Sequence, residues 1–353
     1  MKSRIMPFVH ERPLVIPLFI PHLGCPHRCV FCDQRTITGS GGQLPTPEQI
    51  RAEVNRYLSF THKHYSSIQI SFFGGSFLGL EQAVTLQLLD IAADFVDRGV
   101  VDSLRFSTRP DTIRPDRLAD IAPYPVKTVE LGVQSMNDAV LAVCRRGHTA
   151  TDTIAAATRL KNAGYQLGLQ MMVGLPGDDD HGAMTTARQL VRLNPDFVRI
   201  YPTLVLSGSP LARMHRSGQY QPMDIDACIR LVARLYLLFK ANDIPVVRMG
   251  LQASDGLADP GARLAGPYHP AFGHLVHGQI VLDAICRALA DMKAFPHRLT
   301  IGTHPSMISR VQGLNKRNLH YLQKHHGFKK ISIIQDENIK PDQLMVGDQS
   351  IYY

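Results

Sequence analysis

Short apolar, β-rich runs alternate with longer segments of helical periodicity along most of this chain. Strands are predicted at Leu14–Ile20, Ile68–Phe73, Ser103–Ser107, Thr128–Leu131, Leu167–Met172 and Phe197–Tyr201. Helices are predicted between them, for example at Pro47–Leu58, Leu80–Arg98, Asn137–Cys144, Thr151–Ala163 and Thr185–Leu193. Such alternation favours parallel βαβ units, and six in succession predict an α/β fold with a curved or partial barrel. A doubly wound open sheet is the alternative.

Polar or glycine-rich segments follow the predicted strands: GCPHRC, GGSF, STRPD, GVQS, GLPGDDD and YPTLVLSGS. Because ligands bind at the carboxyl ends of strands in α/β folds, we expect these segments to surround one site. A further helix is predicted at Asp224–Ala241, followed by the strand-like IPVVRMG and a segment rich in Gly, Pro and His. The predicted units are a barrel at 1–252, a connecting loop at 253–277 and a small basic α/β domain at 278–353.

Composition narrows the class of protein. With 44% hydrophobic and 19% charged residues, the chain is typical of globular proteins. We expect a cytoplasmic protein without membrane association, because no apolar run reaches about 18 residues and no secretory signal begins the sequence. Cys144, Cys228 and Cys286 are widely spaced, which favours free thiols over a disulfide framework. The net charge of +8 would attract a polyanion such as tRNA, although a slightly basic enzyme is the simpler interpretation.

Half of the six cysteines lie in GCPHRCVFC, where Cys25, Cys29 and Cys32 form a CxxxCxxC pattern. A structural zinc site normally has four protein ligands, so zinc would require His22 or His27 as the fourth and stays an alternative. A redox CxxC pair would leave Cys25 unexplained. Three thiolates on a four-iron cluster would leave one iron open to a substrate or cofactor.

This spacing, together with Phe31 before the third cysteine and a predicted strand before the loop, resembles the radical S-adenosylmethionine (SAM) superfamily. The resemblance implies a partial (β/α)6 TIM-like barrel and a 4Fe-4S cluster held by Cys25, Cys29 and Cys32. The open iron would chelate the amino and carboxylate groups of SAM. A reducing electron donor such as flavodoxin or ferredoxin would then drive cleavage of SAM to a 5′-deoxyadenosyl radical that abstracts a hydrogen atom.

The segments RFSTRPD, VELGVQS, LAVCRRGHT, GLPG and YPTLVLSGSPL sharpen the resemblance. Together they are similar to the radical SAM domain of the Elongator catalytic subunit family, and also to oxygen-independent coproporphyrinogen oxidases. The resemblance implies that Arg146 contacts the SAM carboxylate, Gln134 the ribose and Gln170 the ribose or adenosine side. The full set of residues assigned to SAM in this way is Phe31, Gly74, Gly75, Ser76, Ser107, Gln134, Arg146 and Gln170. Without the resemblance, Arg146 would be interpreted as a cation at a helix terminus.

Histidines and aspartates elsewhere have simpler interpretations. His148 is a polar loop residue or a substrate contact. The run GDDDH is predicted to cap a helix that begins near Ala183. His269, His274 and His277 lie in the segment predicted as a loop, where structural roles are favoured over a second metal site.

The segment after 277 is predicted to contain two helices joined by a glycine-led basic loop, GLNK, and then a strand. This order resembles the RNA-binding core of a KH module, with Lys316 where a second glycine is expected. The alternative is an α/β cap with a basic solvated face. The acetyltransferase domain of the Elongator family is not recognisable here. The predicted RNA footprint is Arg310, Lys316, Arg317, Lys324, Lys329 and Lys330.

The function predicted from these features is that of a radical SAM enzyme acting on a tRNA nucleoside. A small molecule such as a tetrapyrrole is the alternative substrate. A non-catalytic zinc- or haem-binding scaffold is the alternative class of protein.

Overall fold

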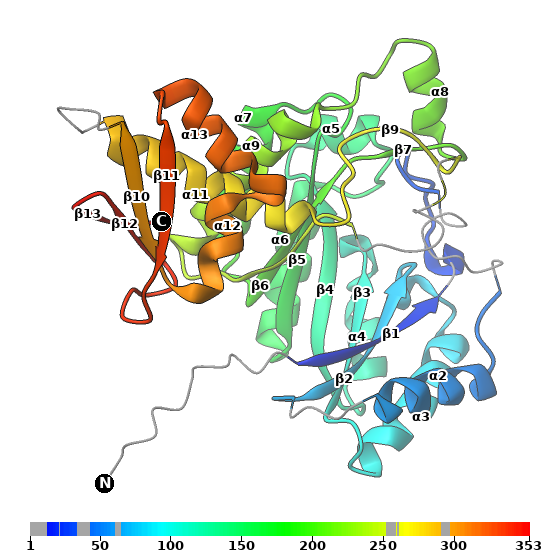
Figure 1. The fold of residues 1–353 in the computed structure, drawn as a ribbon. Coiled ribbons are helices and arrows are strands. Elements are labelled where there is room, and N and C mark those ends of the chain that lie inside the picture. Colours follow the sequence, from blue (N-terminus) through cyan, green and yellow to red (C-terminus); the bar gives the residue numbers. More distant parts are fainter. Residues whose placement is uncertain are drawn as a thin grey trace, which may run out of the picture.

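The computed structural model describes residues 13–20, 22–33, 43–60, 65–251, 259, 261–290 and 297–353. Its larger sheet is parallel and curled (Figure 1). The strands lie side by side in the order β1 (Leu14–Ile20), β2 (Ile68–Gly74), β3 (Ser103–Thr108), β4 (Val126–Gln134), β5 (Gln166–Val173), β6 (Phe197–Pro202) and β8 (Val246–Met249). Because this order follows the chain without reversal, the partial barrel is confirmed and the doubly wound sheet is wrong. The strand-like IPVVRMG forms a seventh strand, in addition to the six predicted from alternation.

Helices connect these strands and cover one face of the sheet (Figure 1). Local signals begin several of them: Thr46 and Thr149 each form a capping box at the helix that follows. Asp179 caps the next helix by accepting a hydrogen bond from the amide of Gly182, so that helix begins at Asp180 instead of near Ala183. The helices are α2 (Pro47–Ser59), α3 (Gln82–Asp97), α4 (Pro115–Ile121), α5 (Asp138–Val143), α6 (Ala150–Asn162), α7 (Asp180–Arg192), α8 (Pro210–Arg216) and α9 (Ile225–Lys240).

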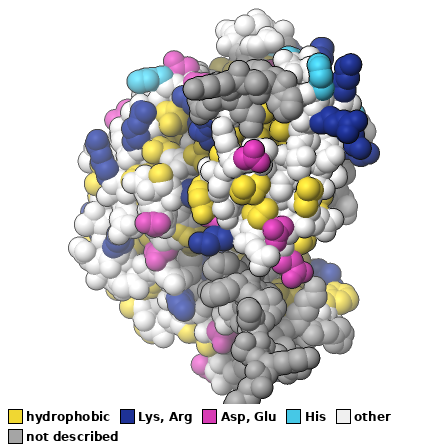
Figure 2. Space-filling view, turned by 60° about the vertical axis from the view of Figure 1, so that its left-hand side comes forward, with side chains coloured by type: hydrophobic (Ala, Val, Ile, Leu, Met, Phe, Trp, Pro, Cys, Tyr) yellow, Lys and Arg dark blue, Asp and Glu magenta, His cyan; other side chains and the backbone are white. Residues whose placement is uncertain are grey.

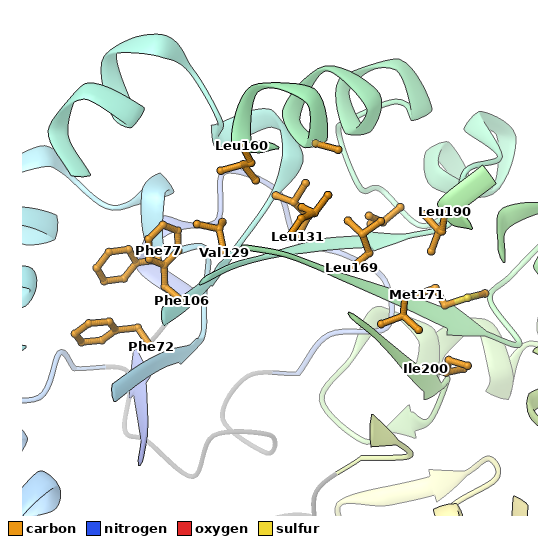
Figure 3. Close-up of a cluster of buried hydrophobic side chains, with 14 of the residues drawn as sticks. Phe72, Phe77, Phe106, Val129, Leu131, Leu160, Leu169, Met171, Leu190 and Ile200 are labelled. Carbon is orange, nitrogen blue, oxygen red and sulfur yellow. The ribbon is translucent and has the colours of Figure 1, made fainter. Parts of the chain in front are cut away.

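The hydrophobic core lies between the sheet and the helices. Leu131 of β4 and Leu169 of β5 are buried there, and Leu160 of α6 packs over them (Figure 3). Since successive side chains of a strand point to opposite faces, the intervening residues Glu130 and Gln170 project from the other side of the sheet. We call that side, on the inside of the curl, the concave face.

A smaller α/β unit follows the barrel, as predicted. Its sheet has the order β11 (Lys330–Gln335), β10 (Arg298–Thr303), β12 (Gln343–Val346) and β13 (Gln349–Tyr352). The hairpin of β12 and β13 is not predicted by the sequence analysis. The helices of this unit are α11 (Phe272–Ala290), α12 (Ile308–Gln312) and α13 (Arg317–His326). A short pair, β7 (Val205–Leu206) and β9 (Arg263–Ala265), lies beside the barrel.

Helix α11 joins the two units. Phe272 and Val276 pack into the barrel core, whereas Val281 and Ile285 pack into the core of the smaller unit. The helix begins inside the segment predicted as a loop, because apolar residues at helical spacing continue through that segment. The proposed boundaries at 252 and 277 remain a prediction.

His274 and His277 of that segment therefore lie on this helix. His277 packs edge-on against Tyr236, while the ring nitrogen Nδ1 of His269 accepts a hydrogen bond from the amide of Ala271 just before the helix. These contacts give both side chains structural roles. Among the described helices, none is both long and apolar enough to cross a bilayer.

Candidate functional site

The predicted site residues gather at the carboxyl ends of the barrel strands. The cysteine loop follows β1 and a short 3-10 turn, η1 (His22–Gly24). A second turn, η2 (Phe77–Gly79), follows β2, and the backbones of the two turns touch. A Cβ atom at Gly24 would lie 2.2 Å from the carbonyl oxygen of Ser76. Only glycine allows this close approach, which anchors the cysteine loop on the segment after β2.

The three cysteines lie near one another in this loop. Cys29 is buried, and its carbonyl accepts a hydrogen bond from the amide of Cys32 at 3.2 Å. Burial raises the pKa of the Cys25 thiol, while the nearby Ser76 backbone and Arg109 act in the opposite direction. Burial also raises the pKa of Cys32, and the neighbouring Cys29 and Cys25 raise it further. The sulfur atoms are thus close enough to influence one another.

This donor set can be compared with what a cluster requires. Three thiols on one short loop, with cationic side chains beside them, suit the thiolate ligands of an iron–sulfur cluster. Within the described part of the chain, no three His, Cys, Asp or Glu side chains converge as a single metal ion requires. His27 packs against Gly147, where a Cβ atom would lie 2.2 Å from the imidazole ring, and the His22 side chain lies outside the described atoms.

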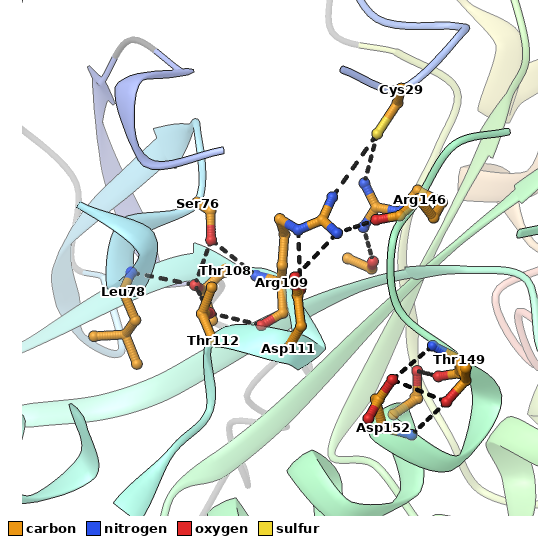
Figure 4. A network of polar contacts seen from close by, with 12 residues as sticks. Cys29, Ser76, Leu78, Thr108, Arg109, Asp111, Thr112, Arg146, Thr149 and Asp152 are labelled. Carbon is orange, nitrogen blue, oxygen red and sulfur yellow. Dashed lines mark hydrogen bonds and ion pairs between the residues drawn. The ribbon is translucent and has the colours of Figure 1, made fainter. Parts of the chain in front are cut away.

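Two arginines converge on Cys29 (Figure 4). The Nη1 atom of Arg146 lies 3.2 Å from the sulfur of Cys29, and that of Arg109 lies 3.9 Å from it. Arg146 also donates to the carbonyl of Gly132, and Arg109 donates to the backbone carbonyl of Arg146. Asp111 binds Arg109 at 2.9 Å and holds its guanidinium in place. Arg146 is a site residue from the sequence analysis, whereas Arg109 was missed.

Gln134 and Gln170 meet on the concave face. The Nε2 atom of Gln170 donates to Oε1 of Gln134 at 3.2 Å. Gln134 has φ 70°, and the register of β4 shifts beside it, so the end of this strand is irregular. A Cβ atom at Gly132 would lie 2.9 Å from Gln134 Nε2 and 3.3 Å from Arg146 Nη2. The glycine therefore leaves room for two predicted SAM residues to approach each other.

The glycine segment after β2 lies beside the cysteine loop. Gly74 has φ 102°, and the Gly75 amide donates to the carbonyl of Ile20 at 3.2 Å. The hydroxyl of the buried Ser76 lies 3.0 Å from the Thr108 hydroxyl and accepts a hydrogen bond from the Arg109 amide (Figure 4). The Ser76 side chain thus links two strand ends.

The remaining predicted residues lie around this group. Ser107 is half-buried in β3, in register with Glu130 of β4. Phe31 packs against a small apolar cluster that includes Val30 and Cys144. The contact of the Phe31 ring with the SAM adenine remains a prediction.

His148 is buried between the arginines and the helix that follows. Among the described atoms, neither ring nitrogen has a hydrogen-bond partner of normal geometry. Burial, together with the positive charges of Arg146 and Arg109, lowers the pKa of His148 to about 4. The imidazole is therefore neutral near pH 7.

An ion cluster on the concave face was also missed by the sequence analysis. Arg105 Nη2 lies 2.6 Å from Glu130 Oε1, and Arg199 Nε lies 2.7 Å from Glu130 Oε2. The side chains are 8%, 4% and 14% exposed, in the order Arg105, Glu130 and Arg199. The sequence does indicate these three residues, because each is a charged residue between two apolar neighbours in a strand, and buried charges need partners.

Comparisons with known proteins agree with this geometry. A model of the radical SAM superfamily matches residues 19–190, and a model of the radical SAM C-terminal domain matches residues 195–281. The tRNA uridine(34) acetyltransferase of Methanocaldococcus jannaschii is 33% identical over 66% of this chain and 51% of its own length. Elongator complex protein 3 of Danio rerio is 26% identical over 62% of this chain and 47% of its own length. The chain thus spans about half the length of these curated relatives.

Solved structures share the fold. The archaeal Elp3 of Methanocaldococcus infernus aligns with a TM-score of 0.61 and 20% identity, covering 76% of this chain and 63% of that one. Methylornithine synthase aligns with a TM-score of 0.51 and 16% identity, covering 74% of each chain. The two family models together match well over half of the sequence. The chain therefore belongs to the radical SAM superfamily, and its homologues include Elongator complex protein 3.

Proposed function

We propose that the chain holds a 4Fe-4S cluster through Cys25, Cys29 and Cys32 and binds SAM at the adjoining carboxyl ends of the strands. The observation that carries this proposal is the convergence of Arg109 and Arg146 on Cys29. Buried guanidinium groups need negative partners, and a metal-bound thiolate supplies one. When bound and reduced, the cluster would supply the electron that cleaves SAM to a 5′-deoxyadenosyl radical.

The chain's own residues would bind and orient SAM. Arg146 is the residue proposed for the carboxylate, and its buried Nε atom has no hydrogen-bond partner among the described atoms. The exposed backbone at Gly74 and the adjoining Gly75 suits the amino group. The joined amides of Gln134 and Gln170 offer a donor and acceptor surface for the ribose hydroxyls. Ser107 and Phe31 are proposed as the remaining neighbours of SAM.

Anaerobic reconstitution tests this part of the proposal. The full chain is incubated with iron and sulfide, and is then given dithionite and SAM. We expect iron and sulfide to be retained and 5′-deoxyadenosine to form. Retention of zinc without sulfide would favour the scaffold alternative, and absence of both a cluster spectrum and 5′-deoxyadenosine would overturn the proposal.

For the substrate, we propose a uridine in tRNA, modified in the cytoplasm with flavodoxin or ferredoxin as the reductant. The similarity to the tRNA uridine(34) acetyltransferase of Methanocaldococcus jannaschii supports tRNA as the substrate class. The charge of +8 supports a polyanion. Lys and Arg side chains gather with His side chains near the upper edges of the face in Figure 2.

The proposed RNA surface centres on the turn between α12 and α13. Asn315 and Lys316 are exposed there in left-handed conformations, with φ 52° and 60°. Arg317 is also exposed and forms an ion pair with Asp226 of α9 at 2.9 Å. The whole footprint proposed for tRNA is Arg310, Lys316, Arg317, Lys324, Lys329 and Lys330.

Charge reversal tests this surface. Changing Lys316 and Arg317 to Glu should weaken tRNA binding and flatten its dependence on salt, because fewer counterions are released. Lys127→Glu is the control, since Lys127 is exposed at the start of β4, far along the strand from the site. Unchanged binding in the double variant would overturn the proposed surface, whatever the result of the SAM experiment.

A further inference from the structure

Two arginines lie side by side on the concave face. Gly132, Gln170, Arg199 and Arg248 are in register across β4, β5, β6 and β8. In β6 and β8, the next residues, Ile200 and Met249, pack into the core on the helix side. The side chains of Arg199 and Arg248 therefore project from the opposite side, in the row that also holds Gln170.

The positive charge in this region exceeds the negative charge. Glu130 is the carboxylate that pairs with both Arg105 and Arg199. Arg248 forms no ion pair with any described residue, and its Nε atom donates only to the carbonyl of Gly250, at 3.2 Å. Among the described residues, this part of the concave face therefore carries three guanidinium groups, of which Arg105 and Arg199 share the carboxylate of Glu130 and Arg248 has no acidic partner.

The arrangement of donors suits an anion. Two positive charges held in a partly desolvated surface are unfavourable unless a counter-charge binds. A guanidinium group presents a planar fork of N–H donors, which matches the oxygens of a phosphate. The half-buried Tyr201 adds a hydroxyl that accepts from Arg199 Nη1 at 3.2 Å and keeps its own proton to donate. Gln170, Tyr201 and Arg248 are all half-buried, so this surface is accessible.

We propose that Arg199 and Arg248, with Tyr201, bind a phosphate group of the substrate nucleotide on the concave face. This inference rests on the proposed function and gives its substrate an anchor beside the SAM site. Gln170 lies between Gln134, which is proposed to bind SAM, and the two arginines. The order of these residues across the sheet therefore sets the direction in which a bound nucleotide would lie. A phosphate held at β6 and β8 would place the attached nucleoside toward β4 and β5.

A mononucleotide tests the site without involving the proposed RNA surface on α13. Binding of UMP and of uridine to the full chain is measured by calorimetry, with and without SAM. We expect UMP to bind at least about tenfold more tightly than uridine, as one charge-assisted contact allows. The variant Arg248→Gln should lose about that factor for UMP and leave uridine unchanged.

Two further variants separate a phosphate contact from a structural effect. Arg188→Gln removes the same charge from the exposed side of α7 and should bind UMP like the wild type. Arg199→Lys keeps the charge but loses the fork, so we expect an intermediate loss of UMP affinity.

The outcomes distinguish this inference from the proposed function. Equal affinities for UMP and uridine, or equal losses in Arg248→Gln and Arg188→Gln, would overturn the phosphate site. If 5′-deoxyadenosine still forms in that case, the proposed radical SAM activity stands without it. If UMP binds as expected but no 5′-deoxyadenosine forms, the anion site stands and the proposed reaction fails.

Discussion

Two pairs of arginines lie in the barrel, and each pair converges on one acidic group. One pair surrounds the carboxylate of Glu130, deep in the sheet, and the other surrounds the thiol of Cys29 at the strand ends. A carboxylate carries its negative charge at neutral pH without help. A cysteine binds a metal as the thiolate, and metal binding releases the thiol proton. The ion pairs at Glu130 are therefore complete in the protein alone, whereas we expect the group at Cys29 to be completed by the proposed iron–sulfur cluster.

The neighbours of Cys29 strengthen this contrast. Burial raises the pKa of both Cys25 and Cys32, so these thiols remain protonated in the bare protein at neutral pH. Arg109 keeps one permanent counter-charge, Asp111, while Arg146 has carbonyl and sulfur partners but no ion pair with a described residue. Positive charge is thus left at the strand ends, where the cluster and the SAM carboxylate are proposed to bind.

Replacing the Cys29 thiol has the largest expected effect, which is on the retention of iron and sulfide. In Cys29→Ser, iron and sulfide retention after reconstitution should fall to background, because a hydroxyl is a poor ligand for iron–sulfur clusters. Cys286→Ser is the matched control, since Cys286 is half-buried in the smaller unit, and it should retain normal iron. Metal and sulfide analysis of both variants provides the measurement. Normal iron and sulfide in Cys29→Ser would show that Arg109 and Arg146 serve something other than a cluster ligand.

Removing the carboxylate should affect the fold itself. Glu130→Gln leaves Arg105 and Arg199 buried without a counter-charge, which should lower the free energy of unfolding by about 3–5 kcal/mol. Urea denaturation of the metal-free chain measures this loss. Asp116→Asn is the control, because its ion pair with Arg114 is exposed and its loss should leave stability unchanged within error. A small effect of Glu130→Gln would mean that water or an anion reaches the two arginines.

The sequence alone predicts most of the barrel. It also predicts part of the group at Cys29, namely Cys29 and Arg146. Strands and helices follow from apolar periodicity, and the cysteine spacing with the strand-end motifs indicates the site. Arg109 was missed because it lies 80 positions from Cys29, and only the parallel order of β1, β2 and β3 brings their ends together. The hairpin of β12 and β13 was missed because each strand has only four residues.

For the Glu130 cluster, the sequence indicates which residues need partners but not which residues pair. A charged residue stands between two apolar neighbours in LRF, VEL and VRI, at Arg105, Glu130 and Arg199. The sequence therefore indicates that each of them has a partner. Which residue pairs with which depends on the neighbours of each strand and on register. In the structure β3, β4 and β6 bring the three together, although Glu130 and Arg199 are 69 positions apart.

The pH dependence of stability tests the surroundings of His148, which is buried near Arg109 and Arg146 at the strand ends. Because burial and the two nearby arginines lower its pKa from 6.5 to about 4, the unfolded chain binds a proton here at a higher pH than the folded chain. This contribution to stability is fully present above pH 6.5 and is lost as the pH falls toward 4. The expected loss is about 3 kcal/mol in total.

The comparison of wild type with His148→Gln isolates this contribution. The difference in unfolding free energy between the two proteins should change by that amount between pH 7 and about pH 4, with the wild type relatively weaker in acid. Urea denaturation at a series of pH values measures it. A difference independent of pH would mean that neither burial nor the charges of Arg109 and Arg146 lower the pKa of His148 in the metal-free chain.

The smallest expected effect comes from two ion pairs of identical spacing. Arg109–Asp111 and Arg114–Asp116 are both Arg-x-Asp pairs with a nitrogen–oxygen distance of 2.9 Å. The first arginine is only 4% exposed and touches Cys29, whereas the second is 62% exposed. Asp111→Asn should lower the free energy of unfolding by about 1–3 kcal/mol, because a buried guanidinium loses its charged partner. Asp116→Asn should not change it measurably.

The same pair of variants also tests how Arg109 acts on the cysteine loop. If Asp111 holds the guanidinium against Cys29, Asp111→Asn should release iron faster under a chelator, while Asp116→Asn should match the wild type. Equal stability and equal iron release in the two variants would mean that the burial of the Arg109–Asp111 ion pair does not strengthen its effect on the protein. In that case Cys29 would be positioned by Arg146 alone, and the contrast with Glu130 would rest on one arginine instead of two.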